Sequence, residues 1–92
     1  MEFLVRQIDN TPLGKEEERA AVRPAEREYA TQLRADGVLR HLWRVPGTRD
    51  AIGWYEAKDP NHLHDVLTGL PSFPFIKVEI ETLAIHPQEM QN

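Results

Sequence analysis

The chain of 92 residues contains no cysteine and no apolar run long enough to cross a membrane. Without cysteine it has no disulfide, no thiolate nucleophile and no cysteine-ligated metal site. A membrane span needs about 20 consecutive apolar residues. The N-terminal stretch MEFLVRQIDN mixes charged residues into its apolar ones, unlike a signal peptide. We therefore expect a soluble, cytoplasmic protein.

An excess of positive charge is also missing, since the formal net charge is −4. This balance argues against non-specific affinity for nucleic acid or for anionic membranes. The length predicts a single domain over residues 1–92. A domain of this size buries only roughly 60–65% of its unfolded surface, so we expect association with further copies of the chain to add stability.

Apolar periodicity and turn formers divide the chain into six elements. Strands are predicted at 2–8, 38–45, 51–57 and 75–85, and helices at 15–37 and 59–71. Pro24 predicts a kink in the first helix or two helical pieces, while Asp59 and Pro60 are typical of a helix start. The order β-α-β-β-α-β predicts an α+β, ferredoxin-like antiparallel sheet with both helices on one face. A partner's sheet could cover the other face.

A glutamate interrupts the apolar stripe of the first helical segment. Glu26 falls between Val22 and Tyr29 at helical spacing. Burying its charge is costly, so one interpretation is an ion pair with Arg23, or rotation toward solvent near Pro24. The other interpretation is a general base kept in apolar surroundings for proton transfer. The pattern alone leaves both open.

The strand LRHLWRVPG mixes polar groups with apolar ones on both faces. Strict alternation places Leu39, His41, Trp43 and Val45 on one face, and Val38, Arg40, Leu42 and Arg44 on the other. An arginine here suits a substrate carboxylate, which its planar fork can bind with two hydrogen bonds. The alternative is an ion pair between subunits, with Glu79 or Glu81 as partner. His41 is either a structural histidine or a catalytic one.

Other motifs predict little chemistry. His62 and His64 are two residues apart and point to different helix faces, so they cannot chelate one metal. The glycines form no phosphate-binding loop. Several aromatic residues either line a small-molecule pocket or simply form core: Tyr29, Trp43, Trp54, Tyr55, Phe73 and Phe75.

Two stretches, LRADGVLRHLWRVPG and LHDVLTGLPSFPFIKVEIETLAIHP, resemble the muconolactone Δ-isomerase family. The likeness runs from about residue 20 to residue 87. It implies a ferredoxin-like subunit that pairs sheet to sheet as a dimeric α/β barrel, a homodimer that assembles further into a decamer. It also implies an isomerase without metal or organic cofactor. The implied reaction converts (+)-muconolactone to 3-oxoadipate enol-lactone in the β-ketoadipate route of aromatic catabolism.

The resemblance also implies roles for individual residues. Glu26 matches the acidic position of the family's K-A-D-E segment and is the implied base; Arg44 or Arg23 would anchor the substrate carboxylate, and His41 would donate to the dienolate oxygen. Arg23 stands where members often have lysine, and Pro24 and Ala25 replace AD. These departures keep two alternatives open: an isomerase or cyclase acting on another lactone or a polyketide-type substrate, and a non-catalytic small-molecule-binding barrel.

Overall fold

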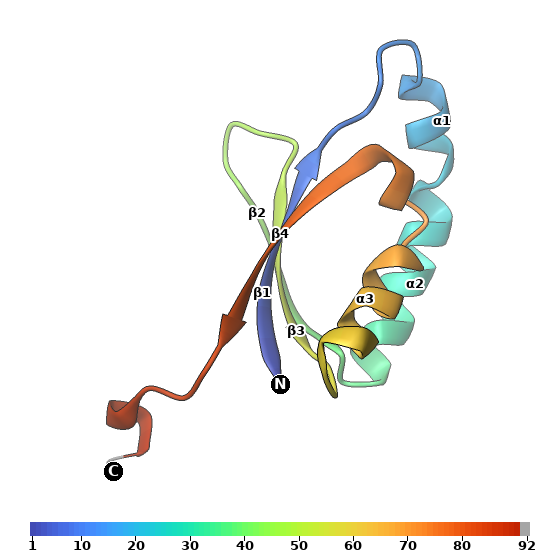
Figure 1. Ribbon diagram of the computed structural model, residues 1–92. Helices are drawn as coiled ribbons and strands as arrows, with labels where there is room; N and C mark the ends of the chain where they lie inside the picture. The colour runs from blue at the N-terminus through green and yellow to red at the C-terminus, as the bar shows by residue number, and fades with distance from the viewer. Residues whose placement is uncertain (91–92) are drawn as a thin grey trace.

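The computed structural model describes residues 1–90 and contains an antiparallel sheet with helices against one face (Figure 1). The elements are β1 Glu2–Asp9, α1 Glu16–Ala21, α2 Arg23–Ala35, β2 Leu39–Arg44, β3 Ala51–Glu56, α3 Pro60–Thr68 and β4 Ile76–Leu83, with short 3₁₀ turns at Phe73–Phe75 and Pro87–Met90. The strand order is β2-β3-β1-β4, and all neighbouring strands are antiparallel. This confirms the predicted α+β, ferredoxin-like architecture.

The first helical segment is divided into two helices at Val22. α1 ends at Ala21 and α2 begins at Arg23, with Pro24 in the first turn of α2. Proline is tolerated there because the first helical N–H groups have no partner within the helix. The predicted division at Pro24 is therefore confirmed. It places Glu26 in the first turn of α2, where its N–H donates to the carbonyl of Val22 at 2.9 Å.

The core lies between the helices and the covered face of the sheet. It consists of Phe3, Val5, Leu33, Leu39, Tyr55, Ala57, Leu63, Val66, Leu67 and Leu70. The last four confirm the apolar face predicted for the second helix. α3 begins as predicted, because the carboxylate of Asp59 accepts a hydrogen bond from the N–H of His62 at 2.8 Å.

A bulge in β2 changes which side chains share a face. Leu39 pairs with Tyr55 on β3, but His41 pairs with the adjacent Trp54, so β2 contains one extra residue at this point. Leu39 therefore faces the helices and is buried, while His41 and Trp43 face the other side of the sheet. The prediction that Leu39 shares a face with His41 and Trp43 was wrong, because strict alternation does not anticipate a bulge.

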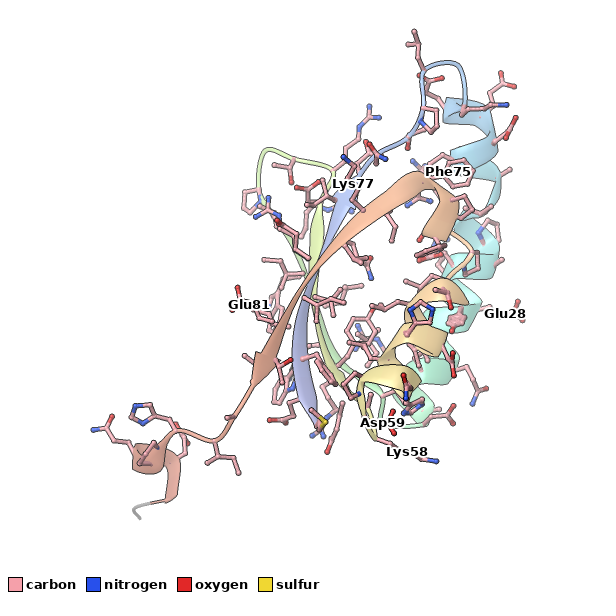
Figure 2. All side chains as sticks on the ribbon, viewed as in Figure 1. Glu28, Lys58, Asp59, Phe75, Lys77 and Glu81 are labelled. Carbon is pink, nitrogen blue, oxygen red and sulfur yellow. The ribbon has the colours of Figure 1, made fainter. Side chains whose placement is uncertain are left out.

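No helix of residues 1–90 covers the second face of the sheet, which we name the open face (Figure 1). It contains a shallow hollow of about 440 Å³ lined by Leu4, Arg6, Ile52, Glu79, Ile80 and Glu81. In Figure 2, Glu81 lies on this side of the sheet, whereas Glu28 lies on the outer surface of α2. Charged and apolar side chains thus share a surface that a second sheet could cover.

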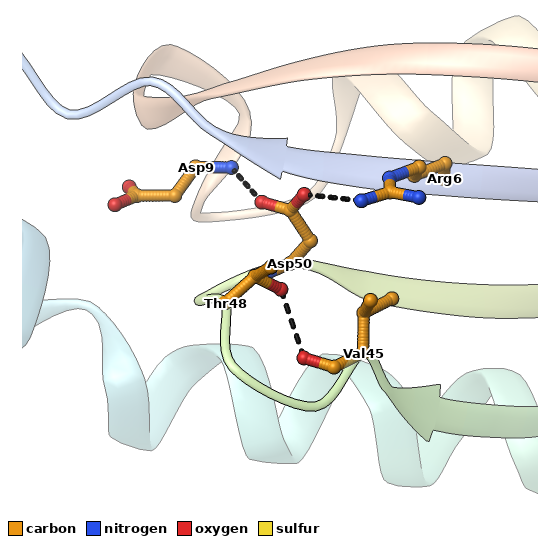
Figure 3. A network of polar contacts seen from close by, with 5 residues as sticks. All are labelled: Arg6, Asp9, Val45, Thr48 and Asp50. Atoms are coloured by element: carbon orange, nitrogen blue, oxygen red, sulfur yellow. Dashed lines mark hydrogen bonds and ion pairs between the residues drawn. The ribbon is translucent and has the colours of Figure 1, made fainter.

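The carboxylate of Asp50 joins the β2–β3 hairpin to the end of β1 (Figure 3). It accepts hydrogen bonds from the guanidinium of Arg6 at 2.8 Å and from the N–H of Asp9 at 3.0 Å. Within the hairpin, the hydroxyl of Thr48 donates to the carbonyl of Val45 at 2.9 Å. The Arg6 hydrogen bond, and then that of Asp9, lower the pKa of Asp50. The hairpin and the carboxyl end of β1 are therefore fixed relative to each other.

Candidate active site

The carboxylate of Glu26 is bound by a single residue, Ser72. One oxygen, Oε2, accepts from the Ser72 N–H at 2.8 Å, and the other, Oε1, accepts from the Ser72 hydroxyl at 2.8 Å. Glu26 is half-buried, and Ser72 is only 1% exposed. Of the two interpretations of Glu26, the ion pair with Arg23 is not formed. The side chain instead lies between α2 and the loop that follows α3.

Tyr29 fixes α2 against α3 beside this contact. Its hydroxyl donates to the carbonyl of Val66 at 2.7 Å, in the last turn of α3. A side chain at Gly69 would meet that hydroxyl, since an added Cβ would lie 2.7 Å from it. Burial, and then the charge of Glu26, raise the pKa of Tyr29. The loop after α3 is therefore held where Ser72 reaches Glu26.

A second polar pair lies on the same covered face. The hydroxyl of Tyr55 accepts from the side-chain amide of Gln7 at 2.8 Å, and the Tyr55 side chain is only 1% exposed. The ring passes over Gly53, where an added Cβ would lie 2.5 Å from Tyr55 Cε1. Burial, and then the charge of Glu26, raise the pKa of Tyr55 to about 12. The phenol thus stays neutral in a region that the Glu26 charge reaches.

The two candidate anchors lie on or near this face. Arg44 pairs with Ala51, which pairs with Gln7, so Arg44 and Gln7 occupy one row across the covered face. Arg44 is exposed. Arg23 is also exposed and lies three residues before Glu26, at the start of α2. Neither guanidinium forms an ion pair with another side chain in residues 1–90. Both are therefore available to an anion.

The structure places three predicted site residues on the open face instead. His41 stacks between Trp43 and Trp54, with ring centroids 5.4 Å and 5.3 Å apart respectively. Arg40 lies over the ring of Trp54 and forms an ion pair with Glu56. The sheet separates this cluster from Glu26. Within one protomer, His41 therefore does not join Glu26, Arg44 and Tyr29.

Phe73 and Phe75, two of the predicted pocket residues, belong to the 3₁₀ turn that directly follows Ser72. Phe73 lines a second hollow, separate from that of the open face. This apolar groove of about 420 Å³ lies between α3 and β4, and Phe73, Leu63 and Val78 are among its lining residues. Phe75 is half-buried at the end of the turn (Figure 2). Glu26 lines neither this groove nor the hollow of the open face. Its carboxylate is instead placed by the two hydrogen bonds from Ser72, and its charge acts on the pKa values of Tyr29 and Tyr55.

Sequence reasoning missed Ser72 and Gln7, and it assigned Tyr55 only as a possible lining or core residue. Gln7 carried a signal, because it continues the alternation of the buried Phe3 and Val5 as a polar residue. Ser72 is a lone polar residue within the stretch LPSFPF. Its partner is 46 residues away, so only the fold reveals the contact.

Between Met1 and Met90, no group of three histidine, aspartate or glutamate side chains is placed to hold a metal ion. Over the same residues, no helix is both long and apolar enough to span a membrane.

The fold and the site together define a small ferredoxin-like α+β domain with a doubly hydrogen-bonded carboxylate on the helix-covered side of its sheet. A family model described as Muconolactone delta-isomerase matches residues 1–89. The chain belongs to the muconolactone delta-isomerase family.

Individual relatives match along nearly their whole length. Muconolactone Delta-isomerase 2 of Acinetobacter lwoffii is 38% identical, covering 100% of this chain and 97% of the relative. Muconolactone Delta-isomerase of Pseudomonas aeruginosa is 33% identical, covering 98% and 95%. The crystal structure of muconolactone isomerase at 3.3 Å resolution superposes with a TM-score of 0.85 at 30% identity, covering 100% and 97%.

A more distant structure shares the fold alone. The 5-chloro-2-hydroxyhydroquinone dehydrochlorinase of Burkholderia phenoliruptrix has a TM-score of 0.75 at 16% identity, covering 96% of this chain and 98% of that one. The relatives at 30% identity and above bear the isomerase name, so the cyclase and the non-catalytic barrel are not favoured.

Proposed function

We propose that the protein isomerises (+)-muconolactone to 3-oxoadipate enol-lactone, a step in the breakdown of aromatic compounds. Family membership over residues 1–89 supports the reaction class. The observation that carries the proposal is the carboxylate of Glu26, half-buried in the helix-covered part of the fold and bound through both oxygens. A base of this kind meets the main requirement of the reaction, which is to move a proton between two carbons.

The proposed reaction moves one proton between two carbons of the substrate and leaves its composition unchanged. Glu26 removes the ring proton at the carbon vinylogous to the lactone carbonyl, and the electrons move to the carbonyl oxygen to give a dienolate. The protonated Glu26 then returns the proton to the carbon α to the carbonyl. The double bond moves by one position, no oxidant or reductant is consumed, and the carboxylate is regenerated.

The exposed arginines supply the positive charge that this reaction needs. Arg44 shares the covered face with Gln7 and is proposed to bind the free carboxylate of the substrate with its planar fork. Arg23 lies three residues before the base and is proposed to stabilise the dienolate oxygen. Unlike a lysine, an arginine stays charged and does not transfer protons here. Proton transfer therefore depends on Glu26 alone.

The first experiment is turnover itself. Purified protein is incubated with (+)-muconolactone and the product is followed by proton NMR. The proposal predicts conversion to the enol-lactone well above the uncatalysed rate, and an Arg44→Ala variant with a raised KM. Conversion no faster than in a protein-free control would contradict the substrate assignment.

We further propose that two copies pair through their open faces as a dimeric α/β barrel, with a decamer as the larger assembly. Trp43 is 49% exposed on this face and stacks on His41. The same face contains the hollow that Leu4, Ile52 and Glu81 help to line, which a partner's side chains could fill. Native mass spectrometry at micromolar concentration should show at least a dimer, and a stable monomer would contradict this pairing. The cytoplasmic location and the single domain over residues 1–92 stay predictions.

A further inference from the structure

We infer that Ser72 is a positioning residue for Glu26, holding the carboxyl group in one orientation both before and after it takes up a proton. This rests on the proposed role of Glu26 as the base. Ser72 contributes two donors to two different oxygens of the same carboxylate. Such a two-point contact fixes the plane of the carboxylate, which a single hydrogen bond does not.

The place of Ser72 in the fold suits this role. It is 1% exposed, and its carbonyl accepts from the N–H of Phe75 at 2.8 Å. The preceding turn is closed by the N–H of Phe73, which donates to the carbonyl of Leu70 at 2.9 Å. Tyr29 joins α2 to the end of α3 close by. Ser72 therefore belongs to a hydrogen-bonded turn, and its two donors are directed from a fixed backbone.

The two donors differ in what they can do during proton transfer. A backbone N–H only donates, so it binds Oε2 as an acceptor and cannot accept a hydrogen bond from a protonated carboxyl group. A hydroxyl both donates and accepts. The Ser72 hydroxyl can donate to Oε1 of the carboxylate and accept from Oε1 of the carboxylic acid. The side chain is thus held in both states that the isomerisation requires.

The test compares Ser72→Ala with Ser72→Thr, using purified protein and (+)-muconolactone. Ser72→Ala removes the hydroxyl but keeps the N–H, whereas Ser72→Thr keeps both donors. We expect Ser72→Ala to lower kcat by about tenfold with little change in KM, the size expected for one hydrogen bond to a charged group. Ser72→Thr should restore kcat.

Two comparisons separate positioning from a structural role. Thr31→Ala deletes a hydroxyl on α2 that donates to the carbonyl of Arg27, and it should leave kcat and KM unchanged. In a Glu26→Gln background, Ser72→Ala should cause no further loss. An unchanged kcat in Ser72→Ala, or an additional loss in the Glu26→Gln background, would overturn the inference.

Different results would contradict the role of Glu26 as the base and the role of Ser72 in positioning it. If Glu26→Gln keeps the full rate, the proposed base is wrong whatever Ser72 does. If the protein does not turn over muconolactone, the ¹³C NMR signal of the Glu26 carboxyl still tests the contact. At pH 7, Ser72→Ala should move that signal away from its position in the unsubstituted protein, and Ser72→Thr should not. Identical spectra of all three proteins would overturn the inference without any activity measurement.

Discussion

The hydroxyl of Tyr29 donates to the carbonyl oxygen of Val66 at 2.7 Å and so joins α2 to the last turn of α3. Carbonyls in the last turn of a helix lack partners within the helix, and this one is satisfied by a side chain from the neighbouring helix. The same contact keeps the loop that contains Ser72 next to Glu26. Stability and the arrangement of the proposed base are therefore linked through one tyrosine.

Replacing Tyr29 with Phe should destabilise the protein by about 1 kcal/mol, the usual value of one hydrogen bond, since the Val66 carbonyl loses its donor. Urea denaturation followed by circular dichroism measures the free energy of unfolding. Thr31→Ala is the matched control, because it removes an exposed hydroxyl bond within α2 and should change stability much less. Equal effects of both substitutions would show that the Tyr29 contact contributes nothing beyond an exposed one.

The Tyr55–Gln7 pair should behave as a coupled unit. Tyr55→Phe leaves the Gln7 amide without its acceptor, and Gln7→Leu leaves the buried phenol without its donor. Each substitution should cost about 1–3 kcal/mol, the price of an unsatisfied buried polar group, and the double variant should cost less than the sum. A double-mutant cycle from denaturation curves measures this coupling. Strict additivity would mean that the hydrogen bond is energetically unimportant.

The raised pKa of Tyr55 predicts alkaline sensitivity. Its pKa is about 12 in the folded protein against an ordinary value of 10.0. Because the folded value is higher, the stabilisation is complete below pH 10 and is lost as the pH rises toward 12. The melting temperature of the unsubstituted protein should fall between pH 10 and pH 12, and that of Tyr55→Phe should fall less steeply. If both melting temperatures fall with the same slope, groups other than Tyr55 cause the loss of stability.

The lowered pKa of Asp50 predicts that the protein loses stability as the pH falls. Its pKa is lowered by the hydrogen bonds from Arg6 and Asp9, so its stabilisation is present above the ordinary value of 3.8. That stabilisation is lost as the pH falls through the folded value. Asp50→Asn should therefore have a lower melting temperature than the unsubstituted protein at pH 7. The two melting temperatures should lie closer together at pH 2.5. Asp65→Asn, which changes an exposed residue of α3, is the control. A difference that stays constant with pH would exclude the charge as its cause.

Local signals in the sequence predicted most of the fold. Pro24 predicted the division of the first helical segment. The spacing of Leu63, Val66, Leu67 and Leu70 predicted the buried face of α3 and of the turn that follows it. The bulge in β2 was not predictable, because a single extra residue in a strand leaves no reliable mark on an alternating pattern. This missed bulge is why Leu39 was assigned to the same face as His41.

The site was predictable only in part. Glu26 was found because a charge on an apolar stripe is locally anomalous. Its partner Ser72 is 46 residues away and depends on how α3 and the following turn pack. The separation of His41 from Glu26 likewise depends on which face of the sheet each approaches. Such contacts between distant segments are properties of the tertiary structure and not of either segment.

The most direct measurement compares kcat of Glu26→Gln with kcat of Glu28→Gln on (+)-muconolactone. Both residues are glutamates of α2, but Glu28 lies exposed on its outer surface (Figure 2), whereas Glu26 is bound by Ser72. If Glu26 carries the proton, Glu26→Gln should lose about 10²- to 10⁴-fold in rate, the range for removal of a general base, while Glu28→Gln stays close to the unsubstituted enzyme. A Glu26→Gln variant as active as Glu28→Gln would contradict the account.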